Sequence, residues 1–278
     1  MIVDLHTHTT ASDGGLSPFE LVQRARERGV QLMAITDHDT VAGFAELQAA
    51  AGDDLRLLAG IELSCTWSGV NIHVLGLGID IAAPAFVSEL EGQRSARDSR
   101  AKLIGQRLDK LGFAGSYEAA AKLAEGRAIG RPDFARVLVA EGHVDSMATA
   151  FDKYLGAGKV GDIKAVWPSL SEVVSWIRGA GGVAVIAHPL QYKMTNAKLR
   201  RMLTEFKEAG GEALEVCNGR PSPQDLGYLR QLCQQFELEA SAGSDFHHPS
   251  SWSELGCDAK VVAPCTPVWA RWQASNPL

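Results

Sequence analysis

The sequence predicts an α/β fold, a parallel sheet or barrel, that carries an all-helical insertion. Short apolar runs alternate with helical patterns in the first third of the 278-residue chain, and the same alternation returns in the last third. Between them, residues 84–164 show helical periodicity with almost no strand signal. We therefore expect one body formed by residues 1–83 and 165–278, interrupted by a helical unit at residues 84–164.

In the first third, Ser17 and Glu20 form a capping box around Pro18, which predicts a helix that ends at Gly29. A second helix is expected at residues 41–51. The strands expected here are residues 2–5, 31–36, 55–65 and 70–77.

In the last third, helices are expected at residues 169–180, 197–209 and 224–236, each followed by a strand, at residues 182–187, 213–217 and 238–242. Strands that alternate with helices imply parallel pairing. Inside the insertion, breaks between helices are expected at residues 111–113, 126, 130–132 and 156–161.

The composition is typical of a globular protein, with 46% hydrophobic and 22% charged residues. The formal net charge of -6 argues against a broad basic surface that grips long nucleic acid. The apolar runs are shorter than the roughly 20 residues of a membrane span, and the N-terminus shows no secretion signal. Five cysteines without a CxxC pair indicate a reducing compartment. We expect a cytoplasmic protein with no membrane partner and no evident obligate protein partner.

Metal-ligand side chains gather at the predicted strand ends. His6 and His8 alternate along one strand, so both imidazoles can face the same side. In a parallel α/β barrel the C-terminal strand ends share one face, where active sites are built. The full set of candidate catalytic and metal-binding residues is His6, His8, Asp13, His38, Glu62, His73, His188, Asp245 and His247.

Single members of this set have ordinary alternatives. His73 could be a hydrogen-bonded core residue, and Asp13 beside Gly14 could be a turn residue. Nine under-paired polar groups would cost about 1–3 kcal/mol each, however, so the set as a whole indicates metal ions. At about three protein ligands per catalytic ion, it predicts two or three ions.

Nitrogen and oxygen ligands without sulfur suit Mn, Fe or Zn. Three divalent ions against the three carboxylates would leave a local charge of about +3, which attracts phosphate although the whole chain is acidic.

Six segments resemble, in order, the motifs of the PHP (polymerase and histidinol phosphatase) family of the amidohydrolase superfamily. They are DLHTHTTASDG, ITDHDT, GIELS, NIHVLG, GGVAVIAHP and SDFHH. The resemblance implies a distorted (β/α)7 barrel that holds two or three divalent ions, Mn²⁺ in first place. The insertion, which contains GRPDFARVLVAEG, is similar to that of the 3′,5′-nucleoside bisphosphate phosphatases, some of which also trim short 5′-phosphorylated oligonucleotides.

The resemblance also implies how the ligands are shared. One ion would be held by His6, His8, Glu62 and Asp245. Glu62 would bridge to a second ion held by His73 and His188, and a third would be held by Asp13, His38 and His247. Around them, we expect Asp4, Asp37 and Asp39 to orient imidazoles through their free N–H groups.

Arginines of the insertion are candidate handles for a second phosphate, because a guanidinium binds phosphate in a bidentate way. Arg131 stands at the start of a predicted helix, whose free N–H groups favour anions, and Arg136 follows on the same helix. Arg97 and Arg100 share a helical face, although that face could simply be solvated. Asn218 follows a strand on the catalytic side and is a further substrate-binding candidate.

The expected reaction is a metal-dependent phosphomonoester hydrolysis. A hydroxide that bridges two ions would attack phosphorus, the ribose 3′-oxygen would leave, and the helical insertion would cap the site and hold the 5′-phosphate. By resemblance, the substrate is a nucleoside 3′,5′-bisphosphate, with adenosine 3′,5′-bisphosphate converted to AMP and phosphate.

Several alternatives stay open. The first is a 5′-to-3′ exoribonuclease that acts on short 5′-phosphorylated oligonucleotides. Others are a phosphatase of another small monoester such as histidinol phosphate, a C–N hydrolase, and a non-catalytic metal or nucleotide sensor.

Overall fold

The computed structural model describes residues 1–47, 55–163, 167–250 and 253–273, which form two compact units. The first unit comprises Met1–Glu89 and Pro168–Leu278, and the second comprises Leu90–Trp167. Across the described residues, no helix combines the length and the apolar composition that a membrane span needs.

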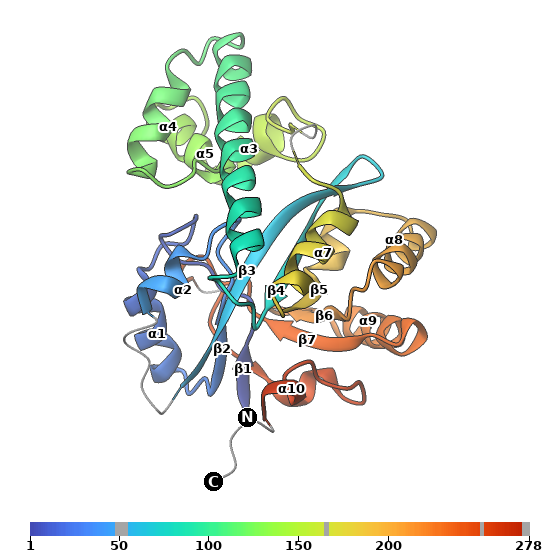
Figure 1. The fold of residues 1–278 in the computed structure, drawn as a ribbon. Coiled ribbons are helices and arrows are strands. Elements are labelled where there is room, and N and C mark those ends of the chain that lie inside the picture. The colour runs from blue at the N-terminus through green and yellow to red at the C-terminus, as the bar shows by residue number, and fades with distance from the viewer. Residues whose placement is uncertain (48–54, 164–166, 251–252, 274–278) are drawn as a thin grey trace. The chain divides into compact units, whose positions relative to one another are not determined.

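The first unit is built on one eight-stranded sheet with the order β7-β6-β5-β4-β3-β2-β1-β8. The sheet curls until its β7 side meets β1, where Leu5 N donates to Ala242 O at 3.1 Å and Thr7 bridges Phe246. The result is a nearly closed mixed barrel, which confirms the predicted α/β class (Figure 1). The strands are β1 (Ile2–Asp4), β2 (Leu32–Ile35), β3 (Arg56–Trp67), β4 (Val70–Leu77), β5 (Val183–Ile186), β6 (Ala213–Asn218), β7 (Glu239–Gly243) and β8 (Cys257–Asp258).

The parallel pairing expected of strands that alternate with helices does not extend to β4, which runs antiparallel to both β3 and β5. The reason is the tight turn between β3 and β4. Ser68 and Gly69 both have positive φ, at 46° and 75°, the backbone of a two-residue hairpin turn. A hairpin joins neighbouring strands without a crossover helix, so β4 must reverse direction. The two-residue strand β8, also antiparallel to β1, is too short to leave a sequence pattern.

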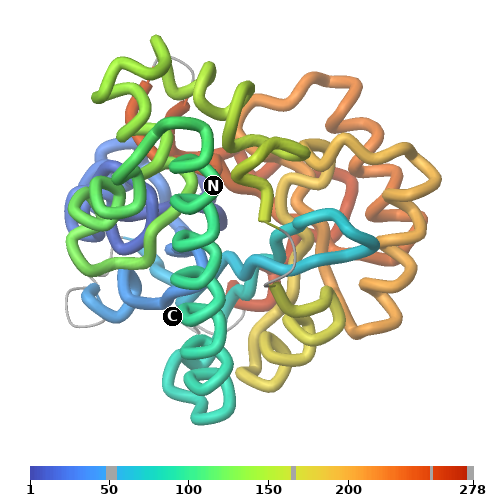
Figure 2. Tube along the Cα trace, turned by 90° about the horizontal axis from the view of Figure 1, so that it is seen from above, coloured from blue at the N-terminus to red at the C-terminus, as the bar shows by residue number. Residues whose placement is uncertain are grey.

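Helices of the first unit lie on the outer side of the strands, as α7, α8 and α9 (yellow to orange) show in Figures 1 and 2. The capping box of α1 is confirmed: Glu20 N donates to Ser17 Oγ, and Ser17 N donates to the Glu20 carboxylate at 2.8 Å. Residues 48–51 of the expected second helix lie outside the described residues. The helices are α1 (Pro18–Glu27), α2 (Ala42–Leu47), α7 (Leu170–Gly179), α8 (Asn196–Glu208), α9 (Pro223–Phe236) and α10 (Ala270–Gln273), with 3-10 turns η2 (Pro189–Tyr192) and η3 (Ala259–Val262).

The second unit is helical and has a hydrophobic core of its own, with Ile104, Leu108, Phe134 and Leu138 buried in it. The long helix α3, which starts in the first unit, has α4 and α5 beside it (Figure 1). The helical elements here are α3 (Pro84–Asp109), α4 (Ser116–Ala124), α5 (Arg131–Ala140), α6 (Met147–Ala150) and the π-helical turn η1 (Phe151–Leu155).

We predict that Gly243→Ala destabilises the barrel, because β7 and the segment after β1 are in direct contact at this glycine. A Cβ on Gly243 would lie 2.4 Å from His6 Cβ and 2.6 Å from His6 N. Moving the backbone aside should cost about 1–3 kcal/mol of unfolding free energy, measured by urea denaturation.

The matched control is Gly227→Ala in the middle of α9, where a Cβ meets nothing within 4 Å. This change should stabilise the protein by about 0.5–1 kcal/mol. Equal stability of the Gly243→Ala variant and the wild type would contradict the close contact at the barrel seam.

Candidate metal centre

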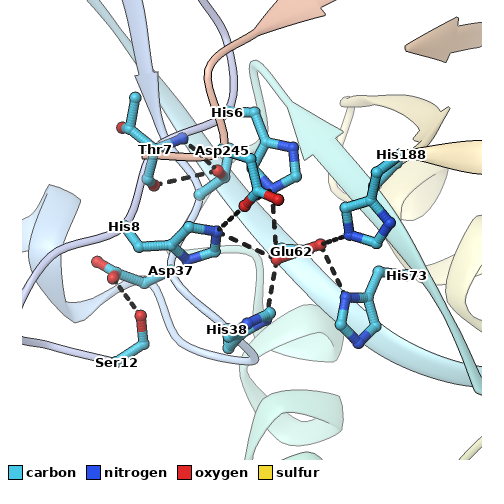
Figure 3. A network of polar contacts seen from close by, with 12 residues as sticks. His6, Thr7, His8, Ser12, Asp37, His38, Glu62, His73, His188 and Asp245 are labelled. Carbon is cyan, nitrogen blue, oxygen red and sulfur yellow. Dashed lines mark hydrogen bonds and ion pairs between the residues drawn. The ribbon is translucent and has the colours of Figure 1, made fainter. Parts of the chain in front are cut away.

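The structure brings all nine predicted ligands together at one end of the barrel. Figure 3 shows seven of them: His6, His8, His38, Glu62, His73, His188 and Asp245. His6 and His8 follow β1, and His38 follows β2. His188, Asp245 and His247 follow β5 and β7, all at C-terminal strand ends. Glu62 lies inside β3, and His73 comes from the first half of β4, which runs the opposite way. The antiparallel strand β4 therefore contributes a candidate ligand to the same end of the barrel as the other strands.

The carboxylate of Glu62 lies at the centre of the cluster and is fully buried. Its Oε1 atom is 2.8 Å from His73 Nδ1 and 3.0 Å from His188 Nε2. Its Oε2 atom faces three more imidazoles, at 2.9 Å from His38 Nδ1, 3.3 Å from His8 Nε2 and 3.4 Å from His6 Nε2.

Two aspartates flank this centre. Asp245 Oδ1 lies 3.4 Å from His6 Nε2 and 3.3 Å from His8 Nε2. Asp13 Oδ1 lies 3.4 Å from His247 Nε2. The ligand atoms form four overlapping groups, each within 4.8 Å: His6, Glu62 and His188; His6, His8 and Asp245; His38, Glu62 and His73; and His8, Asp13, His38 and His247.

The donor set fits divalent metal ions. Among the described residues, His6 Nε2, His8 Nε2 and Glu62 Oε2 are buried atoms with no hydrogen-bond partner, although each of the two nitrogens lies within 3.4 Å of the Glu62 oxygen. Leaving such atoms unpaired would cost about 1–3 kcal/mol each. Atoms that converge without hydrogen bonding are what a bound cation requires. Imidazole and carboxylate donors without thiolate are compatible with Mn, Fe or Zn.

Electrostatics in the cluster favour positive charge. Burial lowers the pKa of His6, but the carboxylates of Glu215 and Asp245 outweigh it and raise this pKa well above its usual value. Burial raises the pKa of Glu62, but charge on His38 and His73 brings it well below the ordinary value. Carboxylates raise the pKa of His247 to about 10, as they raise that of His6, whereas burial lowers the pKa of His8 to about 3 and that of His73 to about 4, so only some of the imidazoles carry protons in the metal-free cluster. Metal ions must displace those protons, because a ligating imidazole is neutral.

Glu215, in the middle of β6, is a functional candidate that sequence reasoning missed. Its side chain is fully buried, and its Oε1 accepts a hydrogen bond from His6 Nδ1 at 2.9 Å. Its Oε2 accepts from the backbone N of His188 at 2.6 Å and from Asn218 Nδ2 at 3.2 Å. The bond to Nδ1 fixes the His6 tautomer and turns Nε2 toward the cluster. The available signal was a carboxylate inside the otherwise apolar run ALEVC.

The expectation that Asp4 and Asp37 orient imidazoles is wrong. Asp4 accepts from the backbone N of Ser244 and of Gly256, each at 2.8 Å. Asp37 accepts from the Thr9 backbone N at 2.7 Å. Both buried carboxylates bind backbone groups that lie next to ligand-bearing segments, so they fix loops. Asp39 likewise accepts from the backbone N of Ser64, at 2.7 Å.

The substrate-binding candidates fall in both units. Asn218 is connected to the cluster of candidate ligands through Glu215, which binds His6. The four arginines belong to the second unit. There, Arg97 and Arg100 lie 5.6 and 5.2 Å from the Trp167 ring. On α5, Arg131 Nη1 donates to Leu155 O at 3.2 Å, and Arg136 Nη1 donates to the Asp133 carboxylate at 2.9 Å. Their role in phosphate binding stays a prediction.

Comparison with known proteins places these features in context. Residues 4–77 match the model of the PHP domain. A 5′-3′ exoribonuclease of Haemophilus influenzae is 41% identical, with 97% of this chain and 98% of that protein covered. A 3′,5′-nucleoside bisphosphate phosphatase of Chromobacterium violaceum is 40% identical, covering 98% and 96%. A solved amidohydrolase from Chromobacterium violaceum, with bound sulfate and no metal, superposes with a TM-score of 0.90 at 40% identity, covering 98% and 96%.

We predict that Glu62→Gln weakens Mn²⁺ binding more than about 100-fold, because outer partners of metal ligands alone account for about 10–100-fold. The amide keeps the shape of the side chain but loses the charge at the centre of the cluster. Isothermal titration calorimetry of chelator-treated protein measures the effect. The control is Glu46→Gln on the exposed side of α2, which should bind like the wild type. Unchanged Mn²⁺ binding by Glu62→Gln would exclude Glu62 as a ligand.

A second prediction concerns Glu215→Gln. The two oxygens of Glu215 face donors only, so the amide NH₂ group of a glutamine must oppose a donor in either orientation. We expect Mn²⁺ affinity to fall about 10–100-fold, while the unfolding free energy of the metal-free protein falls by only about 1–3 kcal/mol. Wild-type affinity in this variant would show that Glu215 does not position His6.

Proposed function

The chain belongs to the PHP-domain family of phosphoesterases, hydrolases of phosphoester bonds, and on this premise we propose that it removes the 3′-phosphate from nucleoside 3′,5′-bisphosphates. Adenosine 3′,5′-bisphosphate, which would yield AMP and phosphate, is the favoured substrate. The observation that carries the proposal is the convergence of nine histidine, glutamate and aspartate side chains, with Glu62 at their centre. Near full-length similarity to a nucleoside bisphosphate phosphatase supports the choice of substrate.

The chemistry follows from what these residues would hold. Two or three divalent ions, Mn²⁺ in first place, would supply an activated water nucleophile and neutralise the charge on the phosphoryl oxygens. We propose all nine clustered side chains as ligands. Glu62 offers its two oxygens to different imidazoles, so it is the proposed bridging ligand. Glu215 accepts hydrogen bonds from His6 Nδ1 and from the backbone N of His188, and in this way it positions both ligands.

The phosphate that is not cleaved needs a separate contact, and we propose that the arginines of the second unit supply it. Arg131 is the first residue of α5, where the positive end of the helix dipole adds to the guanidinium charge. Arg97 and Arg100 share Trp167 as a common neighbour, with their guanidinium carbons 5.6 and 5.2 Å from its ring. Arg136 lies on α5 beside Asp133. In this proposal the helical unit acts as the cap of the catalytic face.

A second candidate function is 5′-to-3′ exonuclease activity on short RNA. The similarity to two 5′-3′ exoribonucleases, of Haemophilus influenzae and Escherichia coli, at 41% and 42% identity favours it. The same metal centre would serve both reactions, because each cleaves a phosphoester whose neighbouring 5′-phosphate is a recognition handle.

We predict that the manganese-loaded protein releases phosphate from adenosine 3′,5′-bisphosphate much faster than from 3′-AMP or 5′-AMP, because only the bisphosphate carries both the reacting group and the handle. Colorimetric phosphate release measures all three rates. Arg131→Ala should raise KM for the bisphosphate, so that the rate of phosphate release from the bisphosphate comes closer to the rate from 3′-AMP. No release from any of the three would contradict the proposal and leave 5′-phosphorylated RNA oligomers as the substrate to test.

A further inference from the structure

A chain of hydrogen bonds runs from the buried metal cluster to the surface of the first unit. It begins at His6 Nδ1, which contacts Glu215 Oε1 at 2.9 Å. Glu215 Oε2 accepts from Asn218 Nδ2 at 3.2 Å, and Asn218 Oδ1 accepts from Gln191 Nε2 at 3.1 Å. His6 and Glu215 are fully buried, Asn218 is half-buried and Gln191 is exposed. The metal cluster and the exposed amide are therefore mechanically connected.

The carboxylate of Glu215 sets the polarity of this chain. An ionised carboxylate only accepts hydrogen bonds, so Asn218 must turn its NH₂ group toward Glu215 and its carbonyl oxygen toward Gln191. Gln191 must in turn offer its NH₂ group to Asn218. Gln191 Oε1 then has no hydrogen-bond partner among the described residues, and it is an acceptor whose orientation is fixed from the interior.

The position of Gln191 is also fixed relative to the catalytic end of the barrel. It lies in η2, directly after the cluster residue His188, and its backbone N donates to His188 O at 3.0 Å. Asn218 ends β6, the neighbouring parallel strand. Ligands of α/β barrels bind at this end of the strands. Next to Gln191, Leu190 has 38% of its surface exposed and provides an apolar contact.

We propose that Gln191 Oε1 accepts a hydrogen bond from the nucleoside part of the substrate, with Asn218 and Glu215 as positioning residues. The inference rests on the proposed function, because it requires a nucleotide bound at the metal centre. The donor is a ribose hydroxyl or an amino group of the base, because an amide oxygen accepts hydrogen bonds from either an O–H or an N–H group. Gln191 thereby distinguishes nucleotides from phosphate esters that lack such a donor.

The test compares Gln191→Leu with the wild type on adenosine 3′,5′-bisphosphate and on p-nitrophenyl phosphate, which has no sugar or base. We expect KM for the bisphosphate to rise about 3- to 10-fold, the effect of one net hydrogen bond, with little change in kcat. The kinetic constants for p-nitrophenyl phosphate and the Mn²⁺ content should stay unchanged. The Kd of AMP, measured by calorimetry, should rise by a similar factor. Gln231→Leu, an exposed glutamine of α9, is the matched control.

Two further comparisons test whether Asn218 positions Gln191 and which group of the substrate is the donor. Asn218→Ala should raise KM for the bisphosphate, and the double variant with Gln191→Leu should be no worse than the stronger single variant, because both act through one oxygen. If a 2′-hydroxyl is the donor, Gln191→Leu and the wild type have equal KM values for the 2′-deoxy bisphosphate. If the base amino group is the donor, the two are equal for the inosine analogue.

Equal loss on the bisphosphate and on p-nitrophenyl phosphate, or no loss on either, would overturn the inference. A wild-type protein that hydrolyses p-nitrophenyl phosphate but not the bisphosphate would instead refute the proposed function. In that case the KM comparison is made with a 5′-phosphorylated RNA trimer, where an unchanged KM in Gln191→Leu overturns the inference.

Discussion

The burial of the Glu62 carboxylate among five imidazoles is the constraint on which the rest of the structure depends. A carboxylate removed from water is stable only when positive charge or hydrogen-bond donors surround it. Here the surrounding nitrogens come from segments after three parallel strands and from one antiparallel strand, so no local stretch of chain can assemble the site. The barrel has to close before the charge of Glu62 is balanced, and metal ions would complete that balance.

The same contacts close the barrel and bring the candidate ligands together. At the seam between β7 and β1, Asp245 N donates to His6 O, and His8 N donates to Phe246 O, each at 2.9 Å. The residues that close the sheet thus carry or adjoin the candidate ligands. Asp4 stabilises the same seam, because its carboxylate accepts hydrogen bonds from the backbone N of Ser244 and of Gly256. A change that opens the seam would therefore separate ligands.

Much of this could be predicted from the sequence, because the signals are local. The capping box of Ser17 and Glu20, and the histidines that follow apolar runs, depend on spacing along the chain. The rest depends on contacts between distant segments. Glu215 binds His6 across 209 residues, and the partners of Asp4 come from the far end of the chain. The reversal of β4 follows from the tight turn at Ser68 and Gly69, where both residues have positive φ.

The central claim is that Glu62 holds divalent ions at the centre of the cluster. Anomalous diffraction at the manganese absorption edge, from crystals grown with Mn²⁺, tests it most directly. The account predicts two or three peaks, at least one of them within about 2.0–2.3 Å of a Glu62 oxygen, the range of metal–ligand bonds to oxygen and nitrogen. Well-ordered Glu62 and His38 side chains with no anomalous peak between them and the other imidazoles would contradict it.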